Sequence, residues 1–127
     1  MEFTIEGTAV TIERDRVRGN VEQELEQYLD GEPVTFDVDI DLADRSPFQR
    51  QVLQALRDIP YGETRTYKEI AEAIGNPGAT QAVAQACKMN PAPVIIPCHR
   101  VVAEDGLGGY AYGEDVKQAL LELEGAL

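Results

Sequence analysis

The chain has 127 residues, and 43% of them are apolar, so it can bury the core of one compact domain, or of a small lobe joined to one. Such a core requires neither disulfides nor a structural metal. The formal net charge of −12 argues against nucleic-acid binding over the whole surface. Three lysines stand beside eight arginines. This acid-rich, lysine-poor balance favours a halophilic host with a cytoplasm of high salt, and an ordinary acidic protein is the alternative.

The acidic side chains are concentrated near the N-terminus. Residues 1–45 carry 13 acidic and 4 basic side chains, whereas residues 46–127 carry 10 and 7. Within residues 50–100 the balance reverses, with six basic side chains against four acidic ones. If this chain meets a polyanion, the contact is therefore expected in the middle of the sequence.

No apolar stretch approaches the length of a membrane span, and the first residues lack the basic and apolar regions of a secretory signal. We expect a cytoplasmic protein without membrane contact. Its two cysteines, Cys87 and Cys98, form no Cys-x-x-Cys pair, and His99 is the single histidine. This set favours a free thiol over a disulfide or a zinc site, so no metal cofactor is expected.

Residues 1–45 have the pattern of a small α+β lobe. Two short strands are predicted at residues 3–5 and 10–12, and a helix follows Asn20 and ends at Gly31. Apolar and acidic residues then alternate over residues 34–42, which predicts a strand with one buried face.

Residues 46–127 have the pattern of a mainly helical domain, which makes the predicted fold class α+β. Ser46 followed by Pro47 marks a helix start, and a second helix begins at Thr66. After a Gly- and Pro-rich break at residues 75–78, a third helix is predicted over residues 79–89. Two short helices joined in this way are typical of a helix-turn-helix, although many helix pairs that never touch DNA share the pattern.

The segment Pro97-Cys98-His99-Arg100 carries the clearest chemical signal. A cysteine becomes a strong nucleophile as its thiolate, which a neighbouring base or positive charge favours. Adjacent residues of an extended chain point in opposite directions, so Cys98 and His99 are expected to communicate through a water molecule or a bend. The alternative is a buried structural cysteine beside a hydrogen-bonded histidine.

The sequence resembles the O6-alkylguanine-DNA alkyltransferases, also called methylated-DNA–protein-cysteine methyltransferases. The active-site motif of that family is similar to residues 97–101, and further motifs follow in the family's order and spacing over residues 46–125. These motifs are Ser46-Pro47-Phe48-Gln49, Ile59-Pro60-Tyr61-Gly62-Glu63-Thr64, Thr66-Tyr67, Gly75-Asn76-Pro77, Asn90-Pro91, Gly108-Gly109-Tyr110, Lys117 and Leu120-Leu121-Glu122-Leu123-Glu124-Gly125.

The resemblance implies a mechanism without a cofactor. Cys98 matches the thiol that accepts the alkyl group as a thioether, so each molecule acts once. His99 matches a general base that acts through a water, and Glu124 matches the carboxylate that supports it. The implied partner is double-stranded DNA, bound through its minor groove by a monomer with the alkylguanine flipped into a pocket.

The resemblance assigns further roles. Asn90 is expected to brace the active-site turn, Tyr67 to donate a proton or hydrogen bond to the leaving guanine, and Lys117 to lie near the leaving oxygen. The expected substrate contacts are Tyr67, Val101, Tyr110, Ala111 and Tyr112. The expected DNA contacts are Thr80, Gln81, Ala82, Gln85 and Arg100. On pattern alone, Glu124 is equally a solvated charge on an amphipathic helix, and the two tyrosines Tyr67 and Tyr110 are equally core or rim aromatics.

Three departures from the family pattern suggest a different or smaller lesion, or a slower reaction. Gln81 stands where the family usually has an arginine that inserts into the base stack. Ala84 replaces a glycine, and Ala111-Tyr112 replaces Ser-Gly, which removes a hydroxyl and adds bulk expected at the pocket mouth. Two other readings stay open: a non-catalytic sensor of alkyl damage with the same fold, and a helix-turn-helix regulator.

Overall fold

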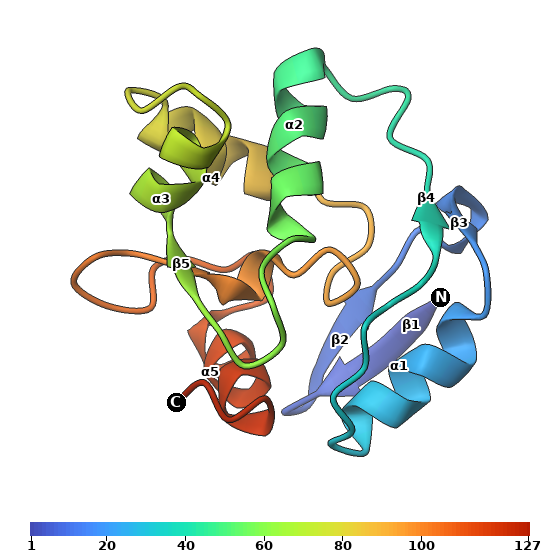
Figure 1. The fold of residues 1–127 in the computed structure, drawn as a ribbon. Coiled ribbons are helices and arrows are strands. Elements are labelled where there is room, and N and C mark those ends of the chain that lie inside the picture. The colour runs from blue at the N-terminus through green and yellow to red at the C-terminus, as the bar shows by residue number, and fades with distance from the viewer.

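A computed structural model describes residues 1–127 as a small mixed α/β protein (Figure 1). The chain begins with an antiparallel hairpin of β1 (Glu2–Ile5) and β2 (Thr8–Thr11), which confirms the first two predicted strands. The turn between them places Glu6 and Gly7 at positive φ, as a tight hairpin turn requires. None of the helices is long and apolar enough to cross a membrane.

The predicted helix after Asn20 is α1 (Val21–Leu29), and the chain leaves it through Gly31 at φ 92°. A 3-10 turn, η1 (Arg14–Arg16), and the short strand β3 (Val17–Arg18) precede this helix. Figure 1 shows α1 beside the β1–β2 hairpin, and the two pack through apolar side chains that include Val10, Val21 and Leu25.

The strand predicted over residues 34–42 is wrong over most of its length, although the pattern of burial is as expected. Only β4 (Asp39–Ile40) pairs with β3. The backbone before it bonds to side chains instead, because Arg57 donates to the carbonyls of Phe36 and Val38 at 2.9 Å each. Phe36 and Val38 are nevertheless buried, so the alternation of apolar and acidic residues reflects side-chain packing rather than strand pairing.

Three helices form the middle of the chain: α2 (Pro47–Leu56), α3 (Tyr67–Ala73) and α4 (Thr80–Cys87). A capping box at Ser46 starts α2, and another at Thr66 starts α3, as their sequences predicted. The three helices pack against one another, and α3 and α4 follow each other closely in the chain (Figure 1).

The last segment returns beneath these helices. Its parts are the 3-10 turn η2 (Cys98–Arg100), the strand β6 (Val101–Val102) and the final helix α5 (Glu114–Leu123). Strand β6 runs parallel to β5 (Arg65–Thr66). This pairing sets the start of α3 beside the segment that carries Cys98, although the two are more than thirty residues apart in sequence.

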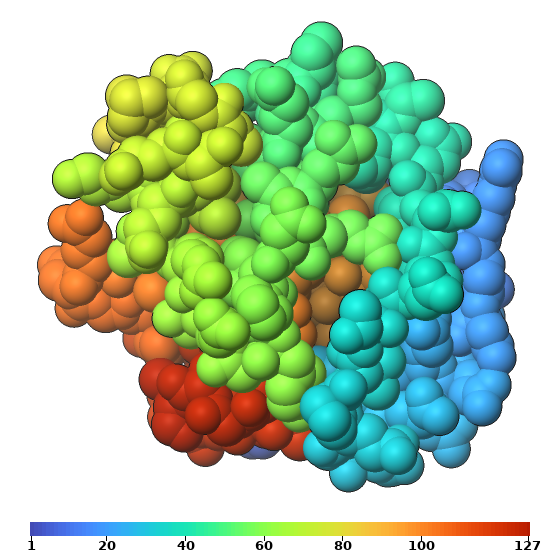
Figure 2. All heavy atoms as spheres, in the orientation of Figure 1, coloured from blue at the N-terminus to red at the C-terminus, as the bar shows by residue number.

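Two apolar clusters hold the structure together, and neither is confined to one end of the chain. The first joins N-terminal residues such as Tyr28 to Val94, Ile95 and Leu120, and the second joins α2, α3 and α4 to Ile96 and Val101. Figure 2 shows the N-terminal residues packed along one side of the rest of the molecule, with a small hollow at the boundary. Ile95 and Pro97 line this hollow, so the segment that leads to Cys98 lies at the boundary between the N-terminal residues and the rest of the molecule.

Replacing Ser46 by alanine removes the hydroxyl that accepts from the Gln49 amide at 3.1 Å. We expect this change to lower the free energy of unfolding by about 1 kcal/mol, the usual value of a helix cap. Urea unfolding measures it. The control is Gln54→Ala on the exposed face of the same helix, which is expected to change stability by less than about 0.5 kcal/mol. Equal effects of the two substitutions would contradict the role of the cap.

Candidate active site

Cys98 lies in a pocket of about 510 Å³ formed between α3, α4 and the loop before α5. The 3-10 turn η2 carries the thiol, and the buried prolines and aliphatic residues before it fix the position of that turn. The residues that line the pocket are Tyr67, Ala84, Cys87, Lys88, Cys98, Gly109, Tyr110 and Ala111. A pocket of this size suits a single flat heterocycle.

The side chain of Asn90 braces the turn, as the resemblance implied. Its amide nitrogen donates to the Ile96 carbonyl at 2.7 Å and to Cys98 Sγ at 3.3 Å, while its oxygen accepts from the Ala92 amide at 2.9 Å. One amide group therefore fixes both the loop and the direction of the thiol.

Cys98 and Cys87 are both free thiols that line the pocket, but their surroundings differ. Burial raises the pKa of both. For Cys98, the hydrogen bond from Asn90 and the charge of Lys117 oppose the rise. The pKa of Cys87 rises to about 12, and no side chain donates a hydrogen bond to it. Of the two, Cys98 is therefore the thiol whose ionised form has a side-chain hydrogen-bond donor.

His99 is fully buried and faces Glu124. Its Nε2 lies 2.7 Å from Glu124 Oε2, while Nδ1 is buried without a hydrogen-bond partner in the protein. Burial lowers the pKa of His99 and outweighs the carboxylate's opposite effect, so the imidazole is neutral near pH 7. A neutral ring that donates from Nε2 keeps a lone pair on Nδ1, and that nitrogen can accept a proton.

Glu124 lies at the end of α5, where it faces His99 and also accepts four hydrogen bonds from three other residues. Tyr28 donates its hydroxyl at 2.5 Å, Arg100 donates twice at 2.8 and 3.1 Å, and the Gly62 amide donates at 3.1 Å. Burial opposes ionisation of this carboxyl, but the bonds from His99, Arg100 and Tyr28 outweigh it and lower its pKa to about 2. Glu124 is therefore a paired buried anion rather than a solvated charge.

Tyr28 is the site residue that sequence reasoning missed. It was assigned only to the apolar face of α1, and its side chain is indeed fully buried. Its hydroxyl also reaches Glu124 and lies 3.5 Å from His99 Nε2. The only sequence signal was a weak extension of the family resemblance around Tyr28-Leu29, because helical periodicity is the same for either role.

The structure corrects the assignment of Arg100 to the DNA-binding surface. Its side chain is buried, and besides Glu124 it donates to the Ile59 carbonyl at 2.7 Å. A buried guanidinium has to be paired, and these bonds use it to hold the carboxylate in place. Arg100 therefore belongs to the support of His99.

Lys117 is also fully buried, and it joins strand β6 to the loop that lines the pocket before α5. Its ammonium donates to the carbonyls of Val101 at 2.6 Å and Gly109 at 3.0 Å, and it lies 5.8 Å from the centre of the Tyr67 ring. Burial lowers the pKa of Lys117. The Val101 side chain is buried away from the pocket, so only its backbone takes part in this contact.

The loop before α5 forms the remaining wall. Tyr110 and Ala111, both expected to contact the substrate, line the pocket. Tyr112 does not line it, which corrects the expectation of bulk at the pocket mouth. Its hydroxyl donates to the Thr11 carbonyl at 3.3 Å and its ring packs beside Tyr110, so it holds the loop against the N-terminal hairpin.

Helix α4 presents the remaining predicted contacts to solvent. Thr80, Gln81, Ala82 and Gln85 are all exposed, whereas Val83 and Ala86 on the opposite side are buried. One helix therefore separates a polar, low-profile face from a packed one, and Ala84 on the same helix lines the pocket.

Comparison with known proteins defines the family. The model of the 6-O-methylguanine DNA methyltransferase DNA-binding domain matches residues 47–126. The chain is 47% identical over 116 residues to the methylated-DNA–protein-cysteine methyltransferase of Methanosarcina acetivorans, covering 91% of this chain and 74% of that one. It is 54% identical over 107 residues to the enzyme of that name from Mycolicibacterium paratuberculosis, covering 84% and 64%.

A solved structure supports the same family. The Mycobacterium tuberculosis OGT in complex with DNA superposes with a TM-score of 0.79 at 50% identity, over 84% of this chain and 66% of that one. The fold and the domain match define a protein of the 6-O-methylguanine DNA methyltransferase class. The chain belongs to the methylated-DNA–protein-cysteine methyltransferase family, which confirms the resemblance seen in its sequence.

Replacing Glu124 by glutamine leaves the Arg100 guanidinium buried without its counter-charge. We expect the free energy of unfolding at neutral pH to fall by about 3 kcal/mol, as for other broken buried pairs. The folded state holds the pKa of Glu124 below its ordinary value of 4.5, so the carboxylate's contribution is present above pH 4.5 and is lost as pH falls toward 2. Denaturant unfolding across this range should show the two proteins converging at the acid end.

The matched control is Glu122→Gln, on the exposed face of the same helix. The Glu122 carboxylate accepts only from Gln118, so this variant is expected to unfold within about 0.5 kcal/mol of the wild type. A Glu124→Gln protein as stable as this control at neutral pH would contradict the role assigned to the carboxylate.

Proposed function

We propose that this protein repairs DNA by moving the alkyl group of an O6-alkylguanine onto the sulfur of Cys98. The Cys98 thiolate attacks the alkyl carbon, an S–C bond forms, and the C–O bond breaks with its electron pair leaving on guanine. The leaving guanine takes up one proton, and the protein keeps the thioether. The observation that carries the proposal is a pocket-lining thiol on the same turn as a neutral, carboxylate-supported histidine.

The proton of Cys98 is assigned to His99. Because Glu124 occupies Nε2, the free lone pair on Nδ1 is the available base, and a single water between Nδ1 and Sγ completes the path. As the imidazolium forms, the Glu124 carboxylate stabilises its charge. Burial keeps Cys98 protonated until this transfer, so the nucleophile forms inside the pocket.

Tyr67 and Lys117 support the leaving guanine from the other wall. Burial raises the pKa of Tyr67 to about 12, so its phenol stays protonated and can donate to the base. Tyr67 also packs against Gly108 at φ 75°, where a Cβ atom would lie 3.2 Å from the ring. Lys117 ties the pocket-lining loop at Gly109 to strand β6 through the carbonyls of Gly109 and Val101.

The DNA contact is assigned to α3 and α4 acting as a helix-turn-helix. The exposed alanine and glutamine side chains of α4 suit close approach to the minor groove of double-stranded DNA, and the pocket beside it accepts the flipped base. We further propose that a monomer suffices, with residues 1–45 acting as a small supporting lobe for the domain of residues 46–127.

The first test measures masses after incubation with duplex DNA that carries O6-methylguanine, in low and in molar potassium chloride. We expect the mass of one methylene on the peptide that contains Cys98. Cys98→Ser should take up no alkyl group, whereas Cys87→Ser should react like the wild type, because the Cys87 thiol stays protonated. Binding to the lesion without any mass change would favour the damage-sensor reading, which the shorter Gln81 also supports.

A second test addresses the departures on α4. Gln81→Arg restores a long cationic side chain on the exposed face of that helix, and we expect it to raise the rate on lesion duplex about tenfold, since flipping free energies amount to a few kcal/mol. The free base O6-benzylguanine needs no flipping, so its rate should be unchanged. A faster reaction with the free base as well would show that Gln81 acts on the pocket rather than on the DNA.

A further inference from the structure

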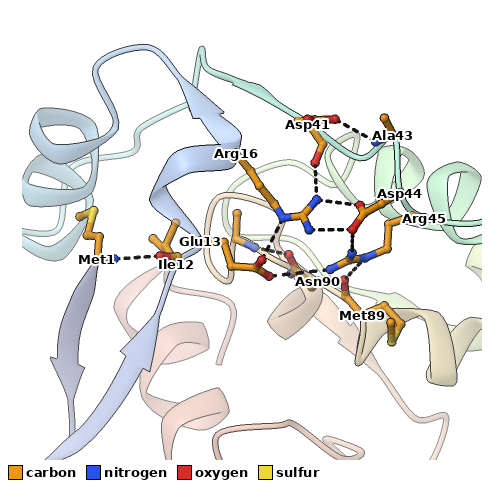
Figure 3. A network of polar contacts seen from close by, with 11 residues as sticks. Met1, Ile12, Glu13, Arg16, Asp41, Ala43, Asp44, Arg45, Met89 and Asn90 are labelled. Atoms are coloured by element: carbon orange, nitrogen blue, oxygen red, sulfur yellow. Dashed lines mark hydrogen bonds and ion pairs between the residues drawn. The ribbon is translucent and has the colours of Figure 1, made fainter.

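A ring of four charged side chains lies between the N-terminal residues and the segment before the active site (Figure 3). Glu13 pairs with Arg16 at 2.9 Å, and Arg16 pairs with both oxygens of Asp44 at 2.7 Å. Asp44 pairs with Arg45 at 3.0 Å, and Arg45 closes the ring on Glu13 at 3.8 Å. The signs alternate around the ring, so it carries no net charge and each cation has two anionic neighbours.

The ring is attached to the backbone on both sides of Asn90. Arg45 Nε donates to the Met89 carbonyl at 2.8 Å, and the Glu13 amide donates to the Pro91 carbonyl at 2.9 Å. Figure 3 shows Met89 and Asn90 directly beside Arg45. Two residues from the N-terminal part therefore hold the carbonyl groups of the residues before and after one asparagine.

Asn90 is the residue whose amide points at the thiol. Its position is set by its own backbone, and small rotations of that backbone move Nδ2 away from Cys98 Sγ, now 3.3 Å distant. The cations of the ring are partly buried, with 11% of the Arg45 side chain and 21% of the Arg16 side chain exposed. Isolated surface ion pairs contribute little to stability, but a closed network can fix geometry.

We propose that Arg45 and Glu13 are positioning residues for Cys98, acting through the backbone of residues 89–91 and the side chain of Asn90. The proposal rests on the proposed function only in that Cys98 is the acceptor. It gives the N-terminal part a role in the reaction beyond packing. Neither residue is in contact with the pocket, so they act on the direction and ionisation of the thiol alone.

The test uses iodoacetamide as the probe, which alkylates a thiolate and needs neither DNA nor guanine. The rate is measured from the alkylation of the peptide that contains Cys98, in a Cys87→Ser background. The temperature is kept well below the midpoint of thermal unfolding of every variant. Arg45→Ala is expected to slow the reaction about fivefold near neutral pH, the factor that corresponds to one ordinary hydrogen bond. Its pH–rate curve should move to higher pH, because the bond from Asn90 helps to lower the thiol pKa.

Arg18→Ala is the matched control, since Arg18 is an exposed arginine of the N-terminal part that takes no part in the ion pairs of the ring. It should react at the wild-type rate. Glu13→Gln breaks two ion pairs but keeps the backbone bond to Pro91, so a smaller loss than in Arg45→Ala is expected, and it carries the test if Arg45→Ala fails to fold. Rates within twofold of the wild type in both ring variants, or an equal loss in Arg18→Ala, would overturn the proposal. A wild-type protein that ignores alkylguanine yet shows these differences would instead refute the proposed function alone.

Discussion

The structure depends on one buried carboxylate. Glu124 accepts hydrogen bonds from α1 through Tyr28, from the turn before α3 through Gly62, and from Arg100 on the active-site turn, where it also faces His99. Burying such a charge costs several kcal/mol unless every lone pair is used, and here each oxygen has at least two partners. Three segments that are distant in sequence must therefore meet before the carboxylate is satisfied. The hydrogen bonds that satisfy Glu124 thus join these segments and also fix the orientation of His99.

Local signals predicted the helices well, because capping boxes and proline at the first position act within a few residues. Ser46 and Thr66 are examples, and each begins its helix as expected. The segment at residues 34–42 shows the limit of such signals. Its alternation predicted which side chains are buried, but Arg57 on a different element took the carbonyls that a neighbouring strand would have used. A pattern of burial does not identify the hydrogen-bond partner.

The candidate site divides in the same way. Cys98, His99, Asn90 and Glu124 were expected from motifs, and the structure brings them together. The contact of Tyr28 was missed because its partner lies 96 residues away in the sequence. Arg100 was wrongly assigned to the DNA contacts because the sequence around an arginine does not show whether its side chain faces solvent or a buried acid. The prediction for Tyr112 was wrong for a related reason, since its hydroxyl donates to Thr11 on the N-terminal hairpin. Contacts between distant segments are the part that single-sequence reasoning does not reach.

The burial of Arg100 and Lys117 has a consequence for binding thermodynamics. Both cations are buried and pair with groups inside the protein. Lys68 and Lys88 are therefore the exposed lysines of a chain with a net charge of −12. A protein that neutralises few phosphates releases few counterions, and its affinity for DNA then falls only slowly as salt rises. The complex proposed above would draw its strength mainly from groove contacts and the enclosed base, and we expect its affinity to depend less on salt than that of a basic DNA-binding protein.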